Sequence, residues 1–330
     1  MKKIIEKLKQ KHRFLVVSHT HPDGDAVGAL LAMGLALKAM GKDVQLYNES
    51  VIPAVYRFLP SMAVIQQKVT PESTFDVAIV LDCGDIERVG TLAQTIGQMP
   101  LVINIDHHVT NTRFGHMQLI DVDACATSEI IFRLLKALPV QIDQTIATAI
   151  YTGILTDTGS FRFSNTNRSA FAICAEMIDN GVDAYAVAQR VYGTYSLGRI
   201  KLLNLALDSL EISSNGRLSM MTLTQRMLRE TRTQAEDIDG IINYARRIQD
   251  VRVAALIHEL CLNGGVSRGR RHFHVSLRSD GSVDVAAIAA RFGGGGHAGA
   301  SGFTIESTLT ELKAQLMALA DTFDGVCAQS

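Results

Sequence analysis

The chain has 330 residues, of which 47% are hydrophobic and 20% are charged, and this size favours two domains over one. Its 32 lysine and arginine residues and 33 aspartate and glutamate residues give a formal net charge of -1. A nearly neutral chain lacks the global basic field that would hold long duplex nucleic acid. No run of about 18 consecutive apolar residues occurs, so the sequence predicts no membrane span and no membrane partner.

The cysteines indicate a reducing compartment. There are five of them, an odd number without a C-x-x-C pair, which predicts reduced thiols in a cytoplasmic protein. They are Cys83, Cys125, Cys174, Cys261 and Cys327. The first 13 residues keep charges inside their apolar pattern, which predicts an amphipathic helix rather than a signal peptide.

The first half of the chain alternates short apolar runs with helical patterns. The predicted strands cover residues 14–18, 44–47, 76–81 and 101–105. Helices are expected at 26–40, which stops at Gly41, and at 128–138, which stops before Pro139. Apolar strands separated by helices are typical of a parallel sheet covered on both faces. We therefore expect an α/β fold, a doubly wound and mainly parallel sheet.

The second half has a different pattern. Helical patterns at 143–155, 168–180 and 184–210 come first, and residues 196–210 are interpreted as a connecting helix. Strands are then expected at 217–222, 251–260, 273–278 and 302–305, with helices near 238–248, 285–292 and 309–322. This order predicts a smaller α+β domain with a mixed sheet. The predicted boundaries are 1–195 for the first domain, 196–210 for the connection and 211–330 for the second domain.

Acidic and histidine side chains gather at the carboxyl ends of the predicted strands. They are His19, Asp23 and Asp25 after the first strand, Asp82 after "DVAIVL", and Asp106, His107 and His108 at the end of "LVINIDHH". Open α/β sheets place their ligand crevice at this edge, so residues far apart in sequence should converge there. A single such Asp is more often a helix cap or turn former. For Asp106, orienting an imidazole and direct metal ligation are equally compatible with the sequence.

Divalent cations would resolve the repulsion in such a cluster, because close carboxylates raise one another's pKa. Carboxylates with imidazoles and no thiolate pair suit an ion such as Mn²⁺ better than structural zinc. A pair of ions bridged by one carboxylate is the arrangement that activates water and holds a phosphoryl oxygen. Asp157 adds a further ligand candidate, since small residues flank it in "YTGILTDTGSFRFSNT".

These residues resemble the motifs of the DHH phosphoesterase family. Four of its motifs occur in order, as "SHTHPDGDAVG", "LDCGD", "IDHHVTN" and "YTGILTDTGSFRF". The resemblance implies two divalent ions, Mn²⁺ first, with Mg²⁺ or Co²⁺ as substitutes. It implies one ion held by His19, Asp23 and Asp82 and a second held by Asp25, Asp82, His107 and Asp157. It also implies that His108 and Asn111 face the scissile phosphate.

The stretch "GGGGHAGASGF", residues 293–303, resembles the signature of the associated C-terminal domain of one branch of this family. By itself, a run of four glycines is more often a flexible loop than an anion-binding nest. The resemblance implies that the second domain closes over the first, so that the active site lies in the cleft between them. The substrate contacts expected from this second domain are Arg278, Gly294, Gly295, Gly296, His297 and Ser301. Arg113 and Arg162 are candidates for phosphate contacts from the first domain, and the basic run 268–271 reads equally well as a solvated hairpin.

The resemblance is strongest to the bacterial nanoRNase/pAp phosphatase group. It implies hydrolysis of short oligoribonucleotides to mononucleotides and of 3'-phosphoadenosine 5'-phosphate (pAp) to AMP, and a homodimer through the first domain is compatible with it. A cyclic or linear dinucleotide phosphodiesterase is the alternative enzyme, although no sensor or membrane segment precedes residue 14. A long-strand exonuclease of the RecJ type needs a further binding domain, and a family II pyrophosphatase needs a Ser-Arg-Lys signature that this chain lacks. A nucleotide sensor without catalysis would be expected to lack a ligand, and none is missing.

Overall fold

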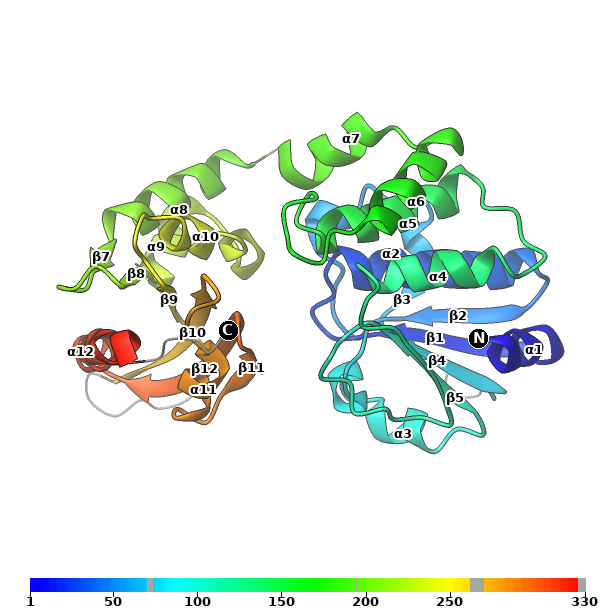
Figure 1. Ribbon diagram of the computed structural model, residues 1–330, viewed down its shortest axis with the longest axis horizontal. Helices are drawn as coiled ribbons and strands as arrows, with labels where there is room; N and C mark the ends of the chain where they lie inside the picture. Colours follow the sequence, from blue (N-terminus) through cyan, green and yellow to red (C-terminus); the bar gives the residue numbers. More distant parts are fainter. Residues whose placement is uncertain (70–73, 194, 262–269, 326–330) are drawn as a thin grey trace. The chain divides into compact units, whose positions relative to one another are not determined.

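A computed structural model describes residues 1–69, 74–193, 195–261 and 270–325 (Figure 1). The chain divides into two compact units, Met1–Thr194 and Tyr195–Ser330. This division lies next to the boundary expected after residue 195. Each unit has its own sheet and its own buried core, and each is described by itself below.

The first unit contains a six-stranded sheet in which every strand pairs parallel to its neighbours. The strand order is β3-β2-β1-β4-β5-β6. The strands are β1 (Arg13–Ser18), β2 (Asp43–Tyr47), β3 (Ile65–Gln66), β4 (Val77–Leu81), β5 (Val102–Asp106) and β6 (Met117–Ile120). The four predicted strands are confirmed within a residue or two, whereas β3 and β6 at the sheet edges are too short for the apolar pattern to reveal them.

Helices cover both faces of this sheet, as a doubly wound fold requires. The helices of the unit are α1 (Lys2–Gln10), α2 (Gly24–Ala39), α3 (Ala93–Gly97), α4 (Thr127–Leu135), α5 (Gln144–Asp157), α6 (Arg168–Asp179) and α7 (Ala184–Ala188). In Figure 1, α2, α4 and α5 lie over one face and α3 lies below the other. Successive strand residues face opposite cores: Val16 packs toward α2, while Leu15 and Val17 pack toward α3.

Three helices approach one another closely at small residues. A Cβ atom added to Gly28 of α2 would overlap the Ala149 carbonyl of α5, and one added to Gly153 of α5 would overlap Ser128 Oγ. The added Gly153 Cβ would also lie 2.8 Å from Asp25 Oδ1. Helices α2, α4 and α5 therefore enclose the carboxylate of Asp25 with little spare room.

The second unit contains a mixed six-stranded sheet of order β11-β12-β10-β9-β8-β7. Only β8 and β9 pair in parallel, and the other neighbours are antiparallel. The strands are β7 (Glu211–Ile212), β8 (Leu218–Leu223), β9 (Val253–Glu259), β10 (Arg271–Ser279), β11 (Gly295–His297) and β12 (Ala300–Ser307). The helices are α8 (Leu197–Asp208), α9 (Gln225–Thr231), α10 (Ile242–Arg246), α11 (Val285–Ala290) and α12 (Leu309–Leu319). Core residues of the sheet pack with α11 and α12 on one face and with α8 and α10 on the other.

The helix expected over 184–210 is interrupted. Helix α7 ends at Ala188, a π-helical turn follows over Gln189–Gly193, and α8 begins at Leu197. Ser196 starts α8 because its side chain accepts a hydrogen bond from the Arg199 amide. Leu202 and Ala206 of α8 are buried in the core of the second unit, so this helix is a packed part of that unit.

No helix in the described part of the chain combines the length and the apolar composition that a bilayer crossing requires.

Candidate metal centre

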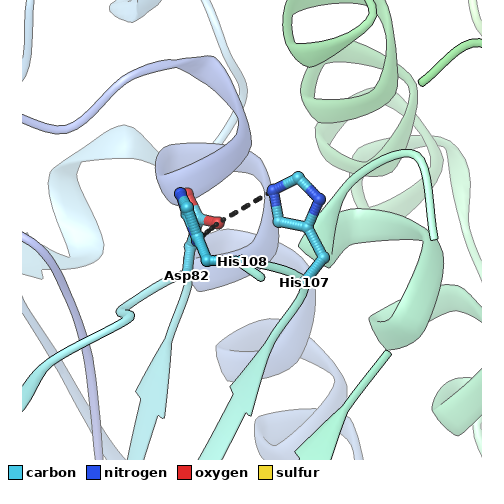
Figure 2. A group of neighbouring side chains, drawn as sticks. All are labelled: Asp82, His107 and His108. Carbon is cyan, nitrogen blue, oxygen red and sulfur yellow. Dashed lines mark ion pairs between the residues drawn. The ribbon is translucent and has the colours of Figure 1, made fainter. Parts of the chain in front are cut away.

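The predicted ligand residues converge at the carboxyl ends of β1, β4 and β5. His19 follows β1, Asp82 follows β4 and Asp106 ends β5. The strand order reverses between β1 and β4, which is the switch point where open α/β sheets bind ligands. Figure 2 shows His107 and His108 directed toward Asp82 from the neighbouring strand end.

The first group of ligand atoms comes from His19, Asp23 and Asp82. His19 Nε2 lies 3.5 Å from Asp82 Oδ2 and 4.0 Å from Asp23 Oδ1. His19 Nδ1 is 2.8 Å from the Thr20 carbonyl, which can only accept, so Nδ1 carries the proton and Nε2 faces the carboxylates. Asp23 also caps α2 by accepting from the Asp25 and Ala26 amides.

The second group of ligand atoms comes from Asp25, His107 and Asp157. His107 Nε2 lies 3.5 Å from Asp157 Oδ2 and 3.7 Å from Asp82 Oδ1. As at His19, the other ring nitrogen of His107 donates to a carbonyl, that of Ala124, at 3.3 Å. Asp82 therefore has one oxygen toward His19 and the other toward His107, which is the placement expected of a bridging carboxylate.

The backbone at Asp82 is in the left-handed region, with φ of 56°. A non-glycine residue in this region is strained and persists only where its surroundings hold it. Asp82 is 1% exposed, and its Oδ1 accepts a hydrogen bond of 2.9 Å from Thr127 Oγ1. The strained turn carries the carboxylate inward, between the two groups of ligand atoms.

Burial and mutual repulsion shift the pKa values of this cluster. Burial and the Asp82 charge raise the pKa of Asp25 to about 7, and burial with the Asp25 charge raises that of Asp157 as well. Burial opposes the charged form of His107, but the charges of Asp25 and Asp157 outweigh it and raise its pKa to about 9. The pKa of Asp82 is lowered despite its burial, chiefly by the hydrogen bond from His19. Protons thus offset part of the negative charge that a divalent cation would otherwise offset.

The donor set fits a divalent cation at each group. Each group supplies carboxylate oxygens and an imidazole nitrogen within 4.8 Å of one another, and each imidazole is oriented by a hydrogen bond from its second nitrogen. Hard-to-borderline ions prefer this mixture of oxygen and imidazole ligands. His108 forms a third overlapping group with Asp82 and His107.

His108 is held by a buried network of side chains. Its Nδ1 lies 2.6 Å from Asp106 Oδ1, while Asn111 Nδ2 donates to Asp106 Oδ2 at 2.6 Å and to Asn104 Oδ1 at 2.8 Å. Asp106 is 0% exposed, and of its two expected roles this geometry matches the orienting one. The Asn111 amide points inward to these residues, so its expected contact with phosphate stays a prediction. Asn104 was not predicted; a lone amide inside the apolar run "VINI" was its only signal.

Two further site features lie on the first unit. Residues Gly159, Ser160 and Phe161 all have positive φ, which makes a tight left-handed turn two residues after Asp157. Arg162 Nε donates to the Gly159 carbonyl within this turn at 2.6 Å, and Arg113 is exposed. Their expected phosphate contacts stay predictions, because no described contact joins either guanidinium to the ligand groups.

The second half of the glycine run forms an ordered strand, which differs from the flexible loop that such a run favours when taken alone. Gly295–His297 form β11, which pairs antiparallel with β12. A Cβ at Gly294 would overlap the Gly302 carbonyl and Phe303, and Gly296 has φ of 142°. These glycines allow the close approach of two strands, which is the physical reason for the ordered conformation.

Arg278 and Ser301 are also expected to contact the substrate from the second unit, and both lie near the glycine strand in the sheet. Arg278 of β10 pairs with Ala300 of β12, which in turn pairs with His297, so Arg278 and β11 lie at the same end of the sheet. Burial lowers the pKa of Arg278, and its Nη1 donates to the Leu277 carbonyl at 3.0 Å. Ser301 Oγ donates to the Val285 carbonyl at 2.6 Å, an internal contact that its expected role did not include.

The basic run behaves as part of the surface of the second unit. Arg270 lies 3.7 Å from Glu311, and Arg271 forms an ion pair with Glu259. Its member Arg268, like Cys327, lies outside the described residues. The two described arginines thus have acidic partners within the protein, as in a solvated hairpin.

The pKa shifts predict how the stability of the metal-free protein depends on pH. Asp25 and His107 keep their protons up to about pH 7 and about pH 9 in the folded chain. The unfolded chain releases the same protons near pH 4 and near pH 6.5. With rising pH the unfolded chain therefore loses protons first, so these groups lower the free energy of unfolding between about pH 4 and about pH 9.

We therefore expect Mn²⁺ to raise the melting temperature more at about pH 8 than at about pH 5.5, because the ion replaces protons on these side chains. Calorimetry with chelator and then with Mn²⁺ at both pH values measures this difference. A metal-induced shift of equal size at the two pH values would contradict the expectation.

Comparison with known proteins identifies the family of the chain. Residues 13–154 match the family model described as "DHH family, N-terminal domain", and residues 220–329 match the "DHHA1 domain". The chain is 33% identical over 294 residues to the bifunctional oligoribonuclease and PAP phosphatase NrnA of Thermus thermophilus, covering 88% of this chain and 83% of that protein. It is 26% identical to the protein of the same name from Bacillus subtilis, covering 88% of each chain. The crystal structure of an exopolyphosphatase-related protein from Bacteroides fragilis superposes with a TM-score of 0.89 at 25% identity, covering 98% and 97% of the two chains.

The fold, the ligand groups and these matches together define a phosphoesterase, a hydrolase of phosphoric ester bonds. The chain belongs to the DHH family and carries the DHHA1 domain after its catalytic domain.

Proposed function

We propose that the protein is a Mn²⁺-dependent enzyme that hydrolyses short oligoribonucleotides to mononucleotides and pAp to AMP. The observation that carries this proposal is the pair of ligand groups next to each other: Asp82 belongs to the first, and its Oδ1 lies 3.7 Å from His107 Nε2 of the second. They occur in a chain whose sequence is similar to that of an oligoribonuclease and PAP phosphatase over 88% of its length. The near-zero net charge also favours short substrates over long polymers.

We assign the first ion to His19, Asp23 and Asp82, and the second to Asp25, Asp82, His107 and Asp157. Two divalent ions at such a site lower the pKa of water and withdraw charge from a phosphoryl oxygen. The orientation of both imidazoles, with Nε2 toward the carboxylates, supports this assignment. Mn²⁺ is proposed first, with Mg²⁺ or Co²⁺ as substitutes; the two imidazoles in the ligand set favour a transition-metal ion over Mg²⁺.

His108 is proposed to contact the phosphoryl group through Nε2. Its Nδ1 proton is donated to Asp106, so the ring is held in one orientation with Nε2 turned away from that carboxylate. An imidazolium paired with buried Asp106 stabilises the negative charge that develops on the phosphoryl oxygens. Asn111 supports this role by holding the second oxygen of Asp106.

The second unit is proposed to bind the part of the substrate that is not cleaved. Arg278 and the glycine strand would contact a second phosphate or nucleotide. Arg278 lies at the same end of the sheet as the glycine strand, and a guanidinium can bind a phosphate through two hydrogen bonds. Location in the cytoplasm and a homodimer through the first unit complete the proposal, and light scattering on the purified protein tests the latter.

Turnover assays test the proposed function. A dinucleotide, pAp, a cyclic dinucleotide and pyrophosphate are each offered with Mn²⁺ and then with chelator. We expect Mn²⁺-dependent release of mononucleotides from the dinucleotide and of phosphate from pAp. Preference for the cyclic dinucleotide would favour the alternative phosphodiesterase, and binding of nucleotides without turnover would favour a sensor.

Replacing Arg278 should affect substrates selectively. In Arg278→Ala we expect kcat/KM for pAp and for the dinucleotide to fall by about tenfold to 100-fold, because a charge-assisted hydrogen bond contributes about 1.5–3 kcal/mol. A generic phosphodiester without a second phosphate should be hydrolysed at an unchanged rate. Arg270→Ala is the matched control, since Arg270 pairs with Glu311. Equal losses on all substrates would contradict the role of Arg278.

A further inference from the structure

The amino end of α4 is capped by a distant carboxylate. Ala126 occupies the N-cap position and has no side chain that can accept a hydrogen bond. Asp25 accepts instead: its Oδ2 lies 2.6 Å from the Thr127 amide and its Oδ1 lies 2.9 Å from the Ser128 amide. The first peptide amides of α4, with the positive end of its dipole, therefore hold a carboxylate that belongs to the second ligand group.

Thr127 also holds a second carboxylate. Its hydroxyl donates to Asp82 Oδ1 at 2.9 Å, and both side chains are buried. Asp82 belongs to the other ligand groups and stands between His19 and His107. One residue thus touches two acidic side chains from different groups, Asp25 through its amide and Asp82 through its hydroxyl.

These two contacts determine the orientation of the Asp25 and Asp82 carboxylates. Asp82 presents Oδ2 to His19 and Oδ1 to His107, and the Thr127 hydroxyl fixes Oδ1 on the His107 side. Without this donor the buried carboxylate loses a hydrogen bond that holds its plane in this orientation. Partners that orient a ligand in this way change metal affinity without touching the ion.

We propose that Thr127 is a positioning residue of the metal centre, which keeps Asp25 and Asp82 in the orientation that two divalent ions require. This inference rests on the metal-dependent function proposed above. Nothing in the motif-like stretches of the sequence singles out Thr127, because its partners lie 102 and 45 positions away along the chain.

Metal binding by hydroxyl variants of the full chain tests the proposal. Isothermal titration with Mn²⁺ alone should show affinity lowered by about tenfold in Thr127→Val, which keeps the side-chain shape and the amide but removes the donor. Thr127→Ser restores the donor and should restore the affinity. Thr152→Val is the matched control, because the hydroxyl of that buried threonine donates only to the Thr148 carbonyl in the described structure, so its loss should leave Mn²⁺ affinity unchanged.

Turnover adds a second readout. The half-saturating Mn²⁺ concentration should rise by about tenfold in Thr127→Val, while KM for the nucleotide at saturating Mn²⁺ stays near the wild-type value. A melting temperature that falls with unchanged Mn²⁺ affinity, or equal losses in the valine and serine variants, would overturn the positioning role. If Thr127→Val does not fold, Thr127→Ala removes the same hydroxyl donor. Its Mn²⁺ affinity, measured by the same titration, then tests the proposal. A wild-type chain that binds no Mn²⁺ would instead overturn the proposed function.

Discussion

Replacing Asp82 with asparagine is expected to lower turnover of every phosphoester substrate by about 10³-fold or more. Asp82 is the residue shared by both proposed ion sites, and a metal centre contributes several kcal/mol of transition-state stabilisation. Asparagine has the same shape and tolerates the left-handed backbone at this position, where φ is 56°. The loss should therefore come from the missing charge, and steady-state assays at saturating Mn²⁺ measure it.

Asp85→Asn serves as the control for Asp82→Asn. Asp85 lies three positions away and caps a short 3-10 helix by accepting from the Glu87 amide, a role that asparagine fills equally well. We expect its activity to equal that of the wild type. An Asp82→Asn protein that folds and keeps near-normal turnover would defeat the assignment of Asp82 as the shared ligand.

Replacing Asp106 with asparagine is expected to lower kcat on the order of 100-fold with little change in KM. Asp106 accepts from His108 Nδ1 on one oxygen and from the Asn111 amide on the other. In Asp106→Asn, the new carboxamide must keep its oxygen toward the Asn111 donor, so its NH₂ group faces His108 Nδ1. The imidazole then shifts its proton to Nε2 and loses the charged partner that stabilises an imidazolium.

The tautomer of His108 can be read directly. Nitrogen NMR of the labelled protein should report a protonated Nδ1 in the wild type, and Nε2 as the sole protonated ring nitrogen in Asp106→Asn. Asp143→Asn is the control for this change, since Asp143 only caps α5 through the Ile146 amide. An unchanged kcat in Asp106→Asn would contradict the role of the Asp106 and His108 pair.

Periodicity predicted the interior of both units better than their edges. Strand β4 is buried throughout, and its uninterrupted apolar run marks it as a central parallel strand. Edge strand β3 has two residues and no such run. The glycine run showed the opposite difficulty: its composition is typical of a loop, but contact with β12 at Gly294 and Gly296 makes it a strand. Local propensity was overridden there by packing between strands.

The sequence by itself indicated the family and the class of enzyme through its motifs, and it supplied acidic and histidine residues near the ends of apolar strands as candidate ligands. Only the tertiary structure decided how those side chains are held: which oxygen of Asp82 faces which imidazole, that Asp106 orients His108, and that Thr127 joins Asp25 to Asp82. The physical reason is that a hydrogen bond depends on distances of a few tenths of an ångström between groups that the chain brings together only on folding.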